Sequence, residues 1–230
     1  MDKSKQKFTI NDNNVSSKGQ LPEDKYVTYI GNKAAKRRIL IIGNSITRHA
    51  PKDEIGWYGD YGMAASCEEK DYVHLLASRI LEREDACIMV HQLATWEREC
   101  TEDTGLAYAK ASHDFHADTV IFRIGENIKS QTGEGALALM EKAFSTLADY
   151  ICPEGARVIF TTCFWRHGVV DEAIRAVAKK RGMPLVELSD LGDDDRYMAV
   201  GLFEHRGVAM HPGDLGMAMI AERIYKALEA

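Results

Sequence analysis

Three residues spread along this chain of 230 residues could together carry out acyl transfer: Ser45, Asn127 and His211. A serine hydroxyl attacks an ester carbonyl when a histidine takes its proton, and N–H donors such as an asparagine amide stabilise the oxyanion that forms. A single histidine is more often structural than catalytic, and this chain has 8 of them. The chemistry therefore depends on whether the fold brings the three side chains together.

Ser45 directly follows an unbroken apolar run. Residues 39–42 are Ile-Leu-Ile-Ile, which is typical of a strand buried on both faces of a parallel sheet. Gly43 and Asn44 then favour a sharp turn at the end of this strand. Ligands of open parallel sheets bind outside the carboxyl ends of the strands, so a hydroxyl placed there could be a nucleophile. The alternative is an ordinary turn with a capping serine.

The rest of the chain alternates strand and helix patterns. Further strands are expected at 86–90, 119–124, 157–161 and 185–188, and helices at 71–83, 134–151, 171–180 and 215–228. Residues 26–30 could add a short edge strand. Such alternation predicts an α/β protein, a three-layer α/β/α sandwich around a central, mostly parallel five-stranded sheet. Trp96, Asn127 and Trp165 each follow a strand, so we expect them at the same rim as Ser45.

Composition limits the classes of partner. Residues 1–24 are polar and without periodicity, which predicts a flexible N-terminal arm, and residues 25–230 are expected to form a single domain. The net charge of -6 does not favour a nucleic-acid or membrane partner, because such binding needs clustered Lys and Arg. No stretch is apolar enough for a secretory signal or a membrane span, so we expect a cytoplasmic protein.

Metal and cofactor chemistry is not favoured by the sequence. The 5 cysteines show no CxxC spacing, so neither a zinc site nor a disulfide framework is expected. His113 and His116 are close in sequence but have no partner with clear ligand spacing. No glycine-rich phosphate-binding motif follows any predicted strand. We therefore expect no metal and no cofactor.

Three short blocks, in this order, resemble those of the SGNH hydrolases, also called GDSL-type esterases. Gly43-Asn44-Ser45 resembles their Gly-Asp-Ser turn, and Gly125-Glu126-Asn127 resembles their Gly-x-Asn-Asp block. His211 precedes the last predicted helix, as the family's histidine does. The resemblance implies a flavodoxin-like SGNH hydrolase fold and a serine esterase. Ser45 would be the nucleophile and His211 the base, while Asn127 and the Ser45 N–H would bind the oxyanion.

Asn44 replaces the family's usual Asp, and Ile128 replaces the terminal Asp of the Gly-x-Asn-Asp block. Two further departures bear on catalysis. The family's second oxyanion donor is the N–H of a glycine after the second strand, and here Ala94 takes that place in preference to the earlier Gly62. The acid that normally orients the histidine is replaced by Val208. We therefore expect a Ser-His dyad whose imidazole is held either by a backbone carbonyl near Val208 or by Glu204.

The predicted rim loops suggest the substrate. We expect the following residues to bind it: Asn44, Trp57, Trp96, Glu97 and Trp165. Aromatic rings beside polar groups suit sugar rings, which favours a short acyl group such as acetyl on a carbohydrate or another polar alcohol. A packed loop, in which the aromatic side chains of residues 49–66 only cover the core, is the alternative for Trp57. Lipid or thioester acylhydrolysis, and a non-catalytic glycan-binding relative, are the alternative functions.

Overall fold

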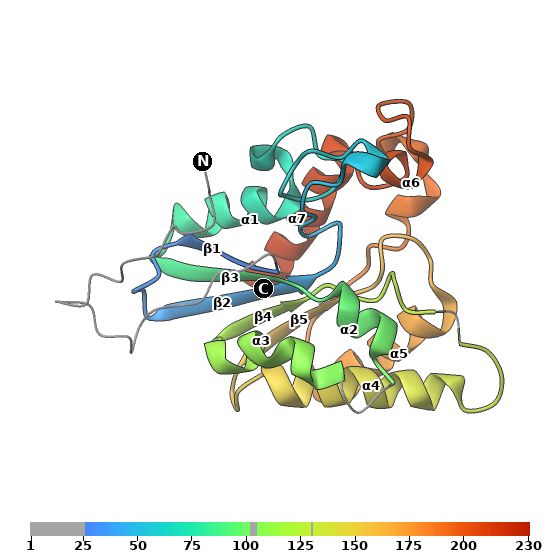
Figure 1. Ribbon diagram of the computed structural model, residues 1–230. Helices are drawn as coiled ribbons and strands as arrows, with labels where there is room; N and C mark the ends of the chain where they lie inside the picture. Colours follow the sequence, from blue (N-terminus) through green and yellow to red (C-terminus); the bar gives the residue numbers. More distant parts are fainter. Residues whose placement is uncertain (1–25, 102–104, 130) are drawn as a thin grey trace, which may run out of the picture.

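A six-stranded sheet forms the centre of the computed structural model, which describes residues 26–101, 105–129 and 131–230 (Figure 1). The strands are β1 Val27–Gly31, β2 Arg37–Gly43, β3 Ala86–Gln92, β4 Thr119–Phe122, β5 Arg157–Thr161 and β6 Leu185–Val186. Their order across the sheet is β1-β3-β2-β4-β5-β6. β1 pairs antiparallel with β3, and every other pair is parallel. The expected α/β class is confirmed, with six strands rather than five because residues 27–31 do form the edge strand.

The side chains of β2 alternate between two hydrophobic cores. Ile39 and Ile41 belong to one core, and Leu40 and Ile42 belong to the other; none is more than 1% exposed. Successive side chains of a strand point to opposite faces, so a strand that is apolar at every position must be covered on both faces. This burial explains why the run before Ser45 has no polar residue.

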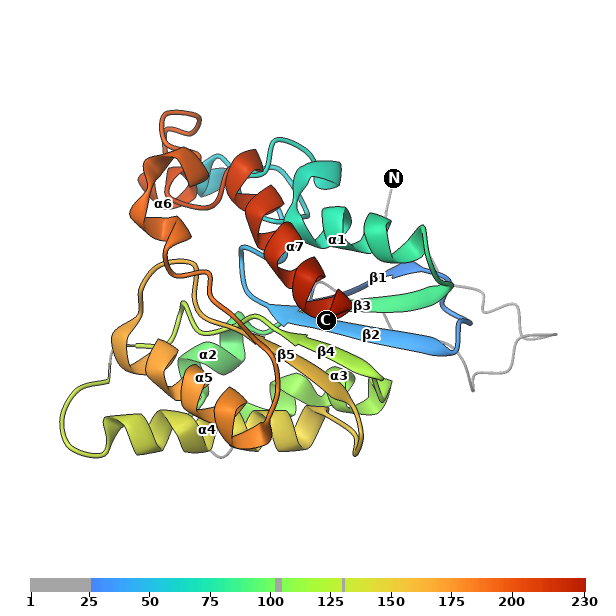
Figure 2. The ribbon, with the colours of Figure 1, turned by 180° about the vertical axis from the view of Figure 1, so that it is seen from behind.

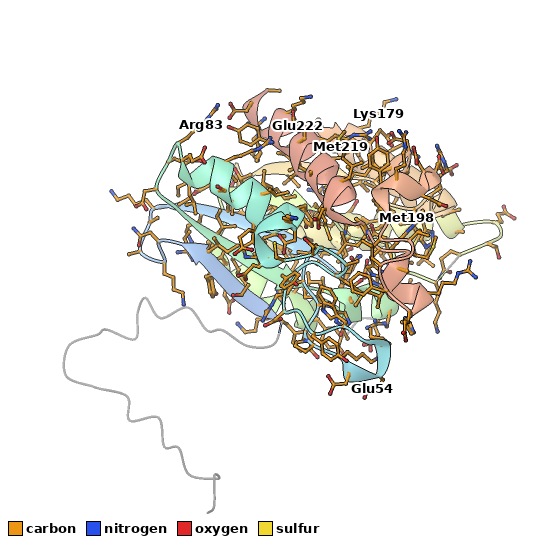
Figure 3. All side chains as sticks on the ribbon, turned by 90° about the horizontal axis from the view of Figure 1, so that it is seen from above. Glu54, Arg83, Lys179, Met198, Met219 and Glu222 are labelled. Atoms are coloured by element: carbon orange, nitrogen blue, oxygen red, sulfur yellow. The ribbon has the colours of Figure 1, made fainter. Side chains whose placement is uncertain are left out.

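Two helices cover the first face of the sheet. They are α1 Tyr72–Leu81 and α7 Asp214–Glu229, and they lie side by side in the view from above, where Glu222 and Met219 mark α7 and Arg83 lies just past the end of α1 (Figure 3). An ion pair between Arg79 and Glu222 joins these two helices. Arg157 at the start of β5 donates hydrogen bonds to carbonyl oxygens in the last turn of α7, at 2.7 and 2.9 Å.

The opposite face is covered by the other long helices (Figure 2). These are α4 Ala136–Ile151 and α5 Gly168–Arg181, with the short helices α2 Ala94–Glu99 and α3 Lys110–Phe115 beside α4. Phe144 of α4 packs on Phe122 of β4 and on Trp96 of α2. The three-layer sandwich is thereby confirmed.

The structure does not test the predicted N-terminal arm, and it contains short helices that were not predicted. The predicted arm 1–24 lies outside the described residues. No helix was predicted in the connection after β3, but it contains α2, which is short and therefore gives a weak periodic signal. α6 Arg206–Ala209 is a single helical turn and likewise went unpredicted. No helix within the described ranges is long and apolar enough to cross a membrane, and all 5 cysteines are free thiols.

Candidate active site

A tight turn at the end of β2 presents Ser45. The N–H groups of Thr47 and Arg48 both donate to the Asn44 carbonyl at 3.0 Å, and the Asn44 side-chain oxygen accepts the Ile46 N–H. Gly43 is needed for space, because a Cβ there would lie 1.7 Å from Thr47 Oγ1. The sequence suggested a special backbone angle at Gly43, whereas the structure shows a close approach of side chain to backbone.

Ser45 and His211 form a hydrogen-bonded pair, although 166 positions separate them in sequence. Ser45 Oγ lies 2.8 Å from His211 Nε2. The Ser45 carbonyl accepts the Met63 N–H at 2.9 Å, and the His211 carbonyl accepts the Ala199 N–H at 2.9 Å. Both backbones are therefore fixed to neighbouring segments. The serine hydroxyl and the imidazole nitrogen lie within proton-transfer distance of each other.

The other ring nitrogen of His211 meets a backbone carbonyl. His211 Nδ1 is 2.6 Å from the Gly207 oxygen, and because a carbonyl can only accept, Nδ1 must carry the proton. This tautomer leaves Nε2 free to accept the proton of Ser45. The backbone alternative for the acceptor thus fits the structure. The Glu204 side chain is exposed and has no hydrogen bond to His211 among the described residues.

Val208 explains why no acid stands at the family's position. Its side chain is completely buried in a small apolar cluster with Trp57, Met63, Ala64 and Ala199. A carboxylate there would lose its hydration without gaining a partner. The turn of α6 that buries Val208 also directs the Gly207 carbonyl to the imidazole.

Burial lowers the pKa of His211 to about 4, although the Gly207 carbonyl acts in the opposite direction. The nearby His49 adds to the lowering. Since the lowered pKa favours the neutral ring, His211 is a free base over the whole neutral pH range. Trp165 stands edge-on to the same ring, with 5.4 Å between ring centroids.

Three N–H groups are available for an oxyanion. The Ser45 N–H has no acceptor among the described residues, and the Ala94 N–H has only a long 3.4 Å contact with Gln92 Oε1. Asn127 Nδ2 donates one hydrogen to Glu97, which leaves its second hydrogen free. Ser45, Ala94 and Asn127 line one cleft with His211, so the structure brings these four predicted residues together.

Glu97 holds this arrangement from behind. It is 1% exposed, and its carboxylate accepts N–H groups from Asn44 at 2.9 Å, from Gly125 at 2.6 Å and from Asn127. The turn that carries Ser45 is therefore tied to the segment that carries Asn127. We expected Glu97 and Asn44 to touch substrate. That expectation is wrong, because both side chains are buried and their hydrogen bonds go to each other, to neighbouring buried side chains and to the backbone.

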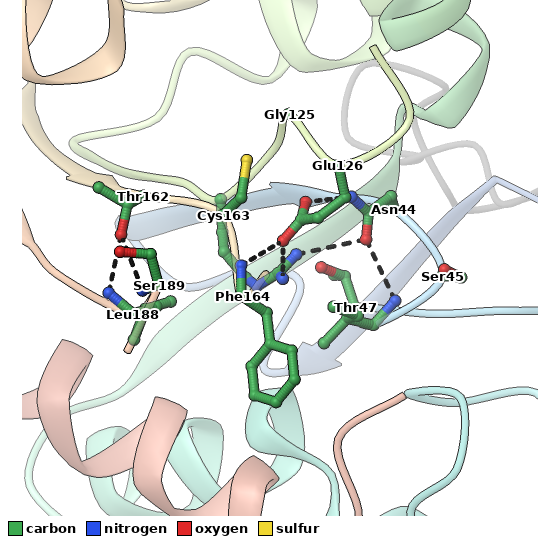
Figure 4. Close-up of polar contacts among 12 residues, drawn as sticks. Asn44, Ser45, Thr47, Gly125, Glu126, Thr162, Cys163, Phe164, Leu188 and Ser189 are labelled. Carbon is green, nitrogen blue, oxygen red and sulfur yellow. Dashed lines mark hydrogen bonds and ion pairs between the residues drawn. The ribbon is translucent and has the colours of Figure 1, made fainter. Parts of the chain in front are cut away.

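A second buried carboxylate, Glu126, supports the first. It forms an ion pair with the fully buried Arg123, accepts a hydrogen bond from Asn44 at 2.5 Å, and accepts the Phe164 N–H at 2.9 Å (Figure 4). Burial, followed by repulsion from Glu126, raises the pKa of Glu97. Burial would also raise the pKa of Glu126, but Arg123 and the N–H donors outweigh it, so the pKa is lowered. The charge of Glu126 is thus compensated locally.

The cleft around Ser45 encloses about 270 Å³. Besides the four predicted residues it is lined by His49, Lys52, Ile55, Met63, Gln92, Arg98, His205, Gly207 and Val208. The loop after β2, with the 3-10 turn η1 Asp53–Ile55, lies beside the segment that carries α6 (Figure 1), and Trp57 packs on Phe203 there. Two distant parts of the chain therefore form the walls.

The tryptophans do not form the expected sugar platform. Trp57 is 2% exposed, donates its indole N–H to the His49 carbonyl and packs on Tyr61. Trp96 is 1% exposed and points from α2 into the core. Both were predicted to bind substrate, and the prediction is wrong because their side chains are needed for packing. Trp165 is the partly exposed one, beside His211.

Sequence reasoning missed the roles of several residues. No motif indicated that Glu97 and Glu126 support the site from behind. No motif indicated that Lys52 and Arg98 line the cleft. The available signal for the scaffold was position: Glu126 lies inside the Gly125-Glu126-Asn127 block, and Glu97 lies three residues after Ala94. Within the described parts of the chain, no three His, Cys, Asp or Glu side chains are grouped so that they could hold a metal ion.

Comparisons with known proteins bear on the fold. No family model matches the sequence, and no curated protein matches it. Solved structures do match: a lipase/acylhydrolase from Enterococcus faecalis has 16% identity and a TM-score of 0.59, over 84% of this chain and 95% of that one. The protein TesA has 16% identity and a TM-score of 0.53, over 84% of this chain and 98% of that one.

A two-domain esterase active on acetylated mannans is also similar. It has 18% identity and a TM-score of 0.52, over 84% of this chain and 49% of that chain. At such identities the likeness shows a shared fold. The α/β fold that the resemblance implied is therefore shared with these lipases and esterases.

Proposed function

We propose that the protein is a serine esterase that hydrolyses carboxylic esters through Ser45 and His211. The observation that carries this proposal is the 2.8 Å contact between Ser45 Oγ and His211 Nε2, in a cleft that also presents three unsatisfied or half-satisfied N–H donors. A purely binding protein has no need for a nucleophile, a base and oxyanion donors at one point. The fold shared with lipases and esterases agrees with this chemistry.

The reaction follows from the positions of the atoms. Ser45 Oγ attacks the ester carbonyl while its proton passes to His211 Nε2, and the carbonyl oxygen gains charge between the N–H groups of Ser45, Ala94 and Asn127. Collapse of this intermediate breaks the bond to the alcohol, which leaves with the proton from Nε2. Water then attacks the acyl-serine with the same base, and the acid product is released.

A short acyl group on a polar alcohol fits the cleft best. The cavity is small and open, and most of the side chains that line it are polar. Long acyl chains prefer an extended apolar groove. The esterase of similar fold that acts on acetylated mannans supports acetyl groups on a carbohydrate as the class to test first.

The experiment compares hydrolysis of 4-nitrophenyl acetate and 4-nitrophenyl octanoate by the wild type, Ser45→Ala and His211→Ala. We expect acetate turnover that falls by about 10³-fold or more in both variants, because nucleophile and base act as a unit. A preference for octanoate would redirect the proposal to lipids. Equal turnover by wild type and Ser45→Ala would refute it.

A further inference from the structure

Two cations share the cleft with the Ser45–His211 pair. Lys52 lies in the loop after β2, and Arg98 lies on α2, four residues after Ala94. They come from different segments and both line the cavity that holds Ser45 and Asn127. None of the residues that line this cavity is an Asp or a Glu.

Neither cation has a partner within the described chain. Among the described arginines, ten form an ion pair with a carboxylate, for example Arg48 with Asp60 and Arg166 with Asp193. Arg98 has no such ion pair and no side-chain hydrogen bond in ranges 26–101, 105–129 and 131–230, and neither does Lys52. Both side chains are exposed, so both charges are available to an anion that enters the cleft.

The electrostatics of a neighbouring side chain agree with this picture. Burial lowers the pKa of His49, and the hydrogen bond to the Ala50 carbonyl acts against it. The charges of Lys52 and Arg98 then lower it further. Both cations therefore act on the same part of the cleft, where their field favours an anion.

A separate hollow next to the cleft has the opposite charge. It shares Ile55 and His205 with the cleft, and it contains the carboxylates of Asp53, Glu54 and Glu204. Glu54 marks the tip of this region in Figure 3. No ion pair joins these carboxylates to Lys52 or Arg98 within the described ranges. The lining is thus negatively charged in the hollow and positively charged in the cleft, with Ile55 between them. An anion is therefore attracted to the cleft that contains Ser45.

We propose that the ester substrate carries an anionic group, a carboxylate or a phosphate, which Lys52 and Arg98 bind beside the scissile bond. This inference rests on the proposed esterase function and adds the substrate class. Charge-assisted hydrogen bonds are about twice as strong as neutral ones, and a guanidinium suits the planar carboxylate. Such a subsite would select an acidic acyl group or an acidic alcohol over its neutral analogue.

The test uses matched esters and matched variants. 4-Acetoxybenzoate and its neutral methyl ester place the charge on the alcohol, while 4-nitrophenyl hemisuccinate and 4-nitrophenyl butyrate place it on the acyl group. The variants are Lys52→Gln with Arg98→Gln, and Arg206→Gln as control, since Arg206 is an exposed arginine without an ion pair that does not line the cleft. kcat/KM is measured for each ester at low and high salt.

In one of the two ester pairs, we expect a higher kcat/KM for the anionic ester than for the neutral one. The pair that shows this preference tells whether the substrate carries its charge on the alcohol or on the acyl group. The double variant should lose about 10- to 100-fold in kcat/KM for that anionic ester and about 2-fold or less for the neutral one. High salt should reduce the preference. The control variant should behave as the wild type.

Failure of this inference can be told apart from failure of the esterase proposal. Equal rates for anionic and neutral esters, or equal losses for both in the double variant, would overturn the anionic subsite while turnover of the neutral esters still supports the esterase. If no ester is turned over, calorimetry of benzoate and inorganic phosphate with the wild type decides. Binding that the double variant loses supports the subsite, and no binding overturns it.

Discussion

At the scale of single residues, the proposed reaction takes its pH range from His211. Its pKa is lowered by burial to about 4, against an ordinary value of 6.5, so the neutral ring that accepts the Ser45 proton persists to lower pH. We predict that kcat/KM for a neutral ester is level from pH 8 to about pH 6 and falls only below about pH 5. The measurement is a pH–rate profile with circular dichroism as a check on folding.

The same profile tests the acceptor of the His211 proton. Because the Gly207 carbonyl, and not Glu204, meets Nδ1, Glu204→Ala should leave both the rate and the profile unchanged. An acid limb near pH 6.5 in the wild type would show that the imidazole is not buried as described. A large loss in Glu204→Ala would show that the carboxylate orients the ring.

Glu97 is a positioning residue for the oxyanion donors. In the wild type, Asn44 and Asn127 donate to different oxygens of Glu97. Glu97→Gln replaces one of these oxygens by an NH2 group, so one of the two amides loses its acceptor. We predict a 10- to 100-fold loss in kcat, by analogy with loss of one oxyanion donor at about 10²–10³-fold, with KM changed by about 2-fold or less. The measurement is steady-state kinetics on a neutral ester.

Glu99→Gln is the matched control on the same helix, because Glu99 bonds to the Tyr108 hydroxyl at the surface and not to the site. It should keep wild-type kinetics. If Glu97→Gln raised KM and left kcat intact, Glu97 would bind substrate after all, as the sequence alone suggested.

At the scale of elements, α6 and the turn after β2 decide what the site contains. Both are short. The geometry of α6 depends on a contact that is distant in sequence, Val208 on Trp57, whereas the turn after β2 depends on the local approach of Thr47 to Gly43. Order and placement of the blocks were predictable because they sit at the ends of strong elements. The burial of Trp57 and Trp96 could not be predicted, since an aromatic residue in a loop or short helix gives no periodic signal of burial.

Val208 tests whether α6 could carry the missing acid. Val208→Asp would put the family's acid back in sequence, but into a cluster in which Val208 is 0% exposed. We predict a loss of about 2 kcal/mol or more in the free energy of unfolding and no gain in kcat. Chemical denaturation and ester hydrolysis, with Val208→Ala as the control for lost volume, measure the two effects. An Asp variant that is stable and faster would mean that α6 can turn its carboxylate to His211.

At the scale of the whole molecule, the parallel sheet brings the residues of the site together. Every parallel strand ends at one rim, so residues that follow β2, β3 and β4 meet there whatever their distance in sequence. This is why Ser45 and Asn127 could be placed at one rim from strand patterns alone, whereas Ala94 was identified only through the family resemblance. His211 follows no strand, and its position depends on packing of α7 against α1, which only the folded chain shows.

The scale of the molecule also explains what the sequence left open. The buried scaffold of Glu97, Glu126 and Arg123 joins three segments, and no local pattern distinguishes a buried glutamate with satisfied hydrogen bonds from an exposed one. The two cations of the cleft likewise become visible only in the folded chain, because Lys52 and Arg98 come from different segments and line the same cavity.

The central claim is that Ser45 is a nucleophile activated by His211, and covalent labelling tests it most directly. A fluorophosphonate probe is incubated with the wild type, Ser45→Ala and His211→Ala, and intact mass spectrometry with peptide mapping locates the adduct. The account predicts a single adduct on Ser45 in the wild type, none in Ser45→Ala, and a labelling rate in His211→Ala lower by about 10²-fold or more. An adduct on another residue, or labelling of Ser45 that does not depend on His211, would contradict it.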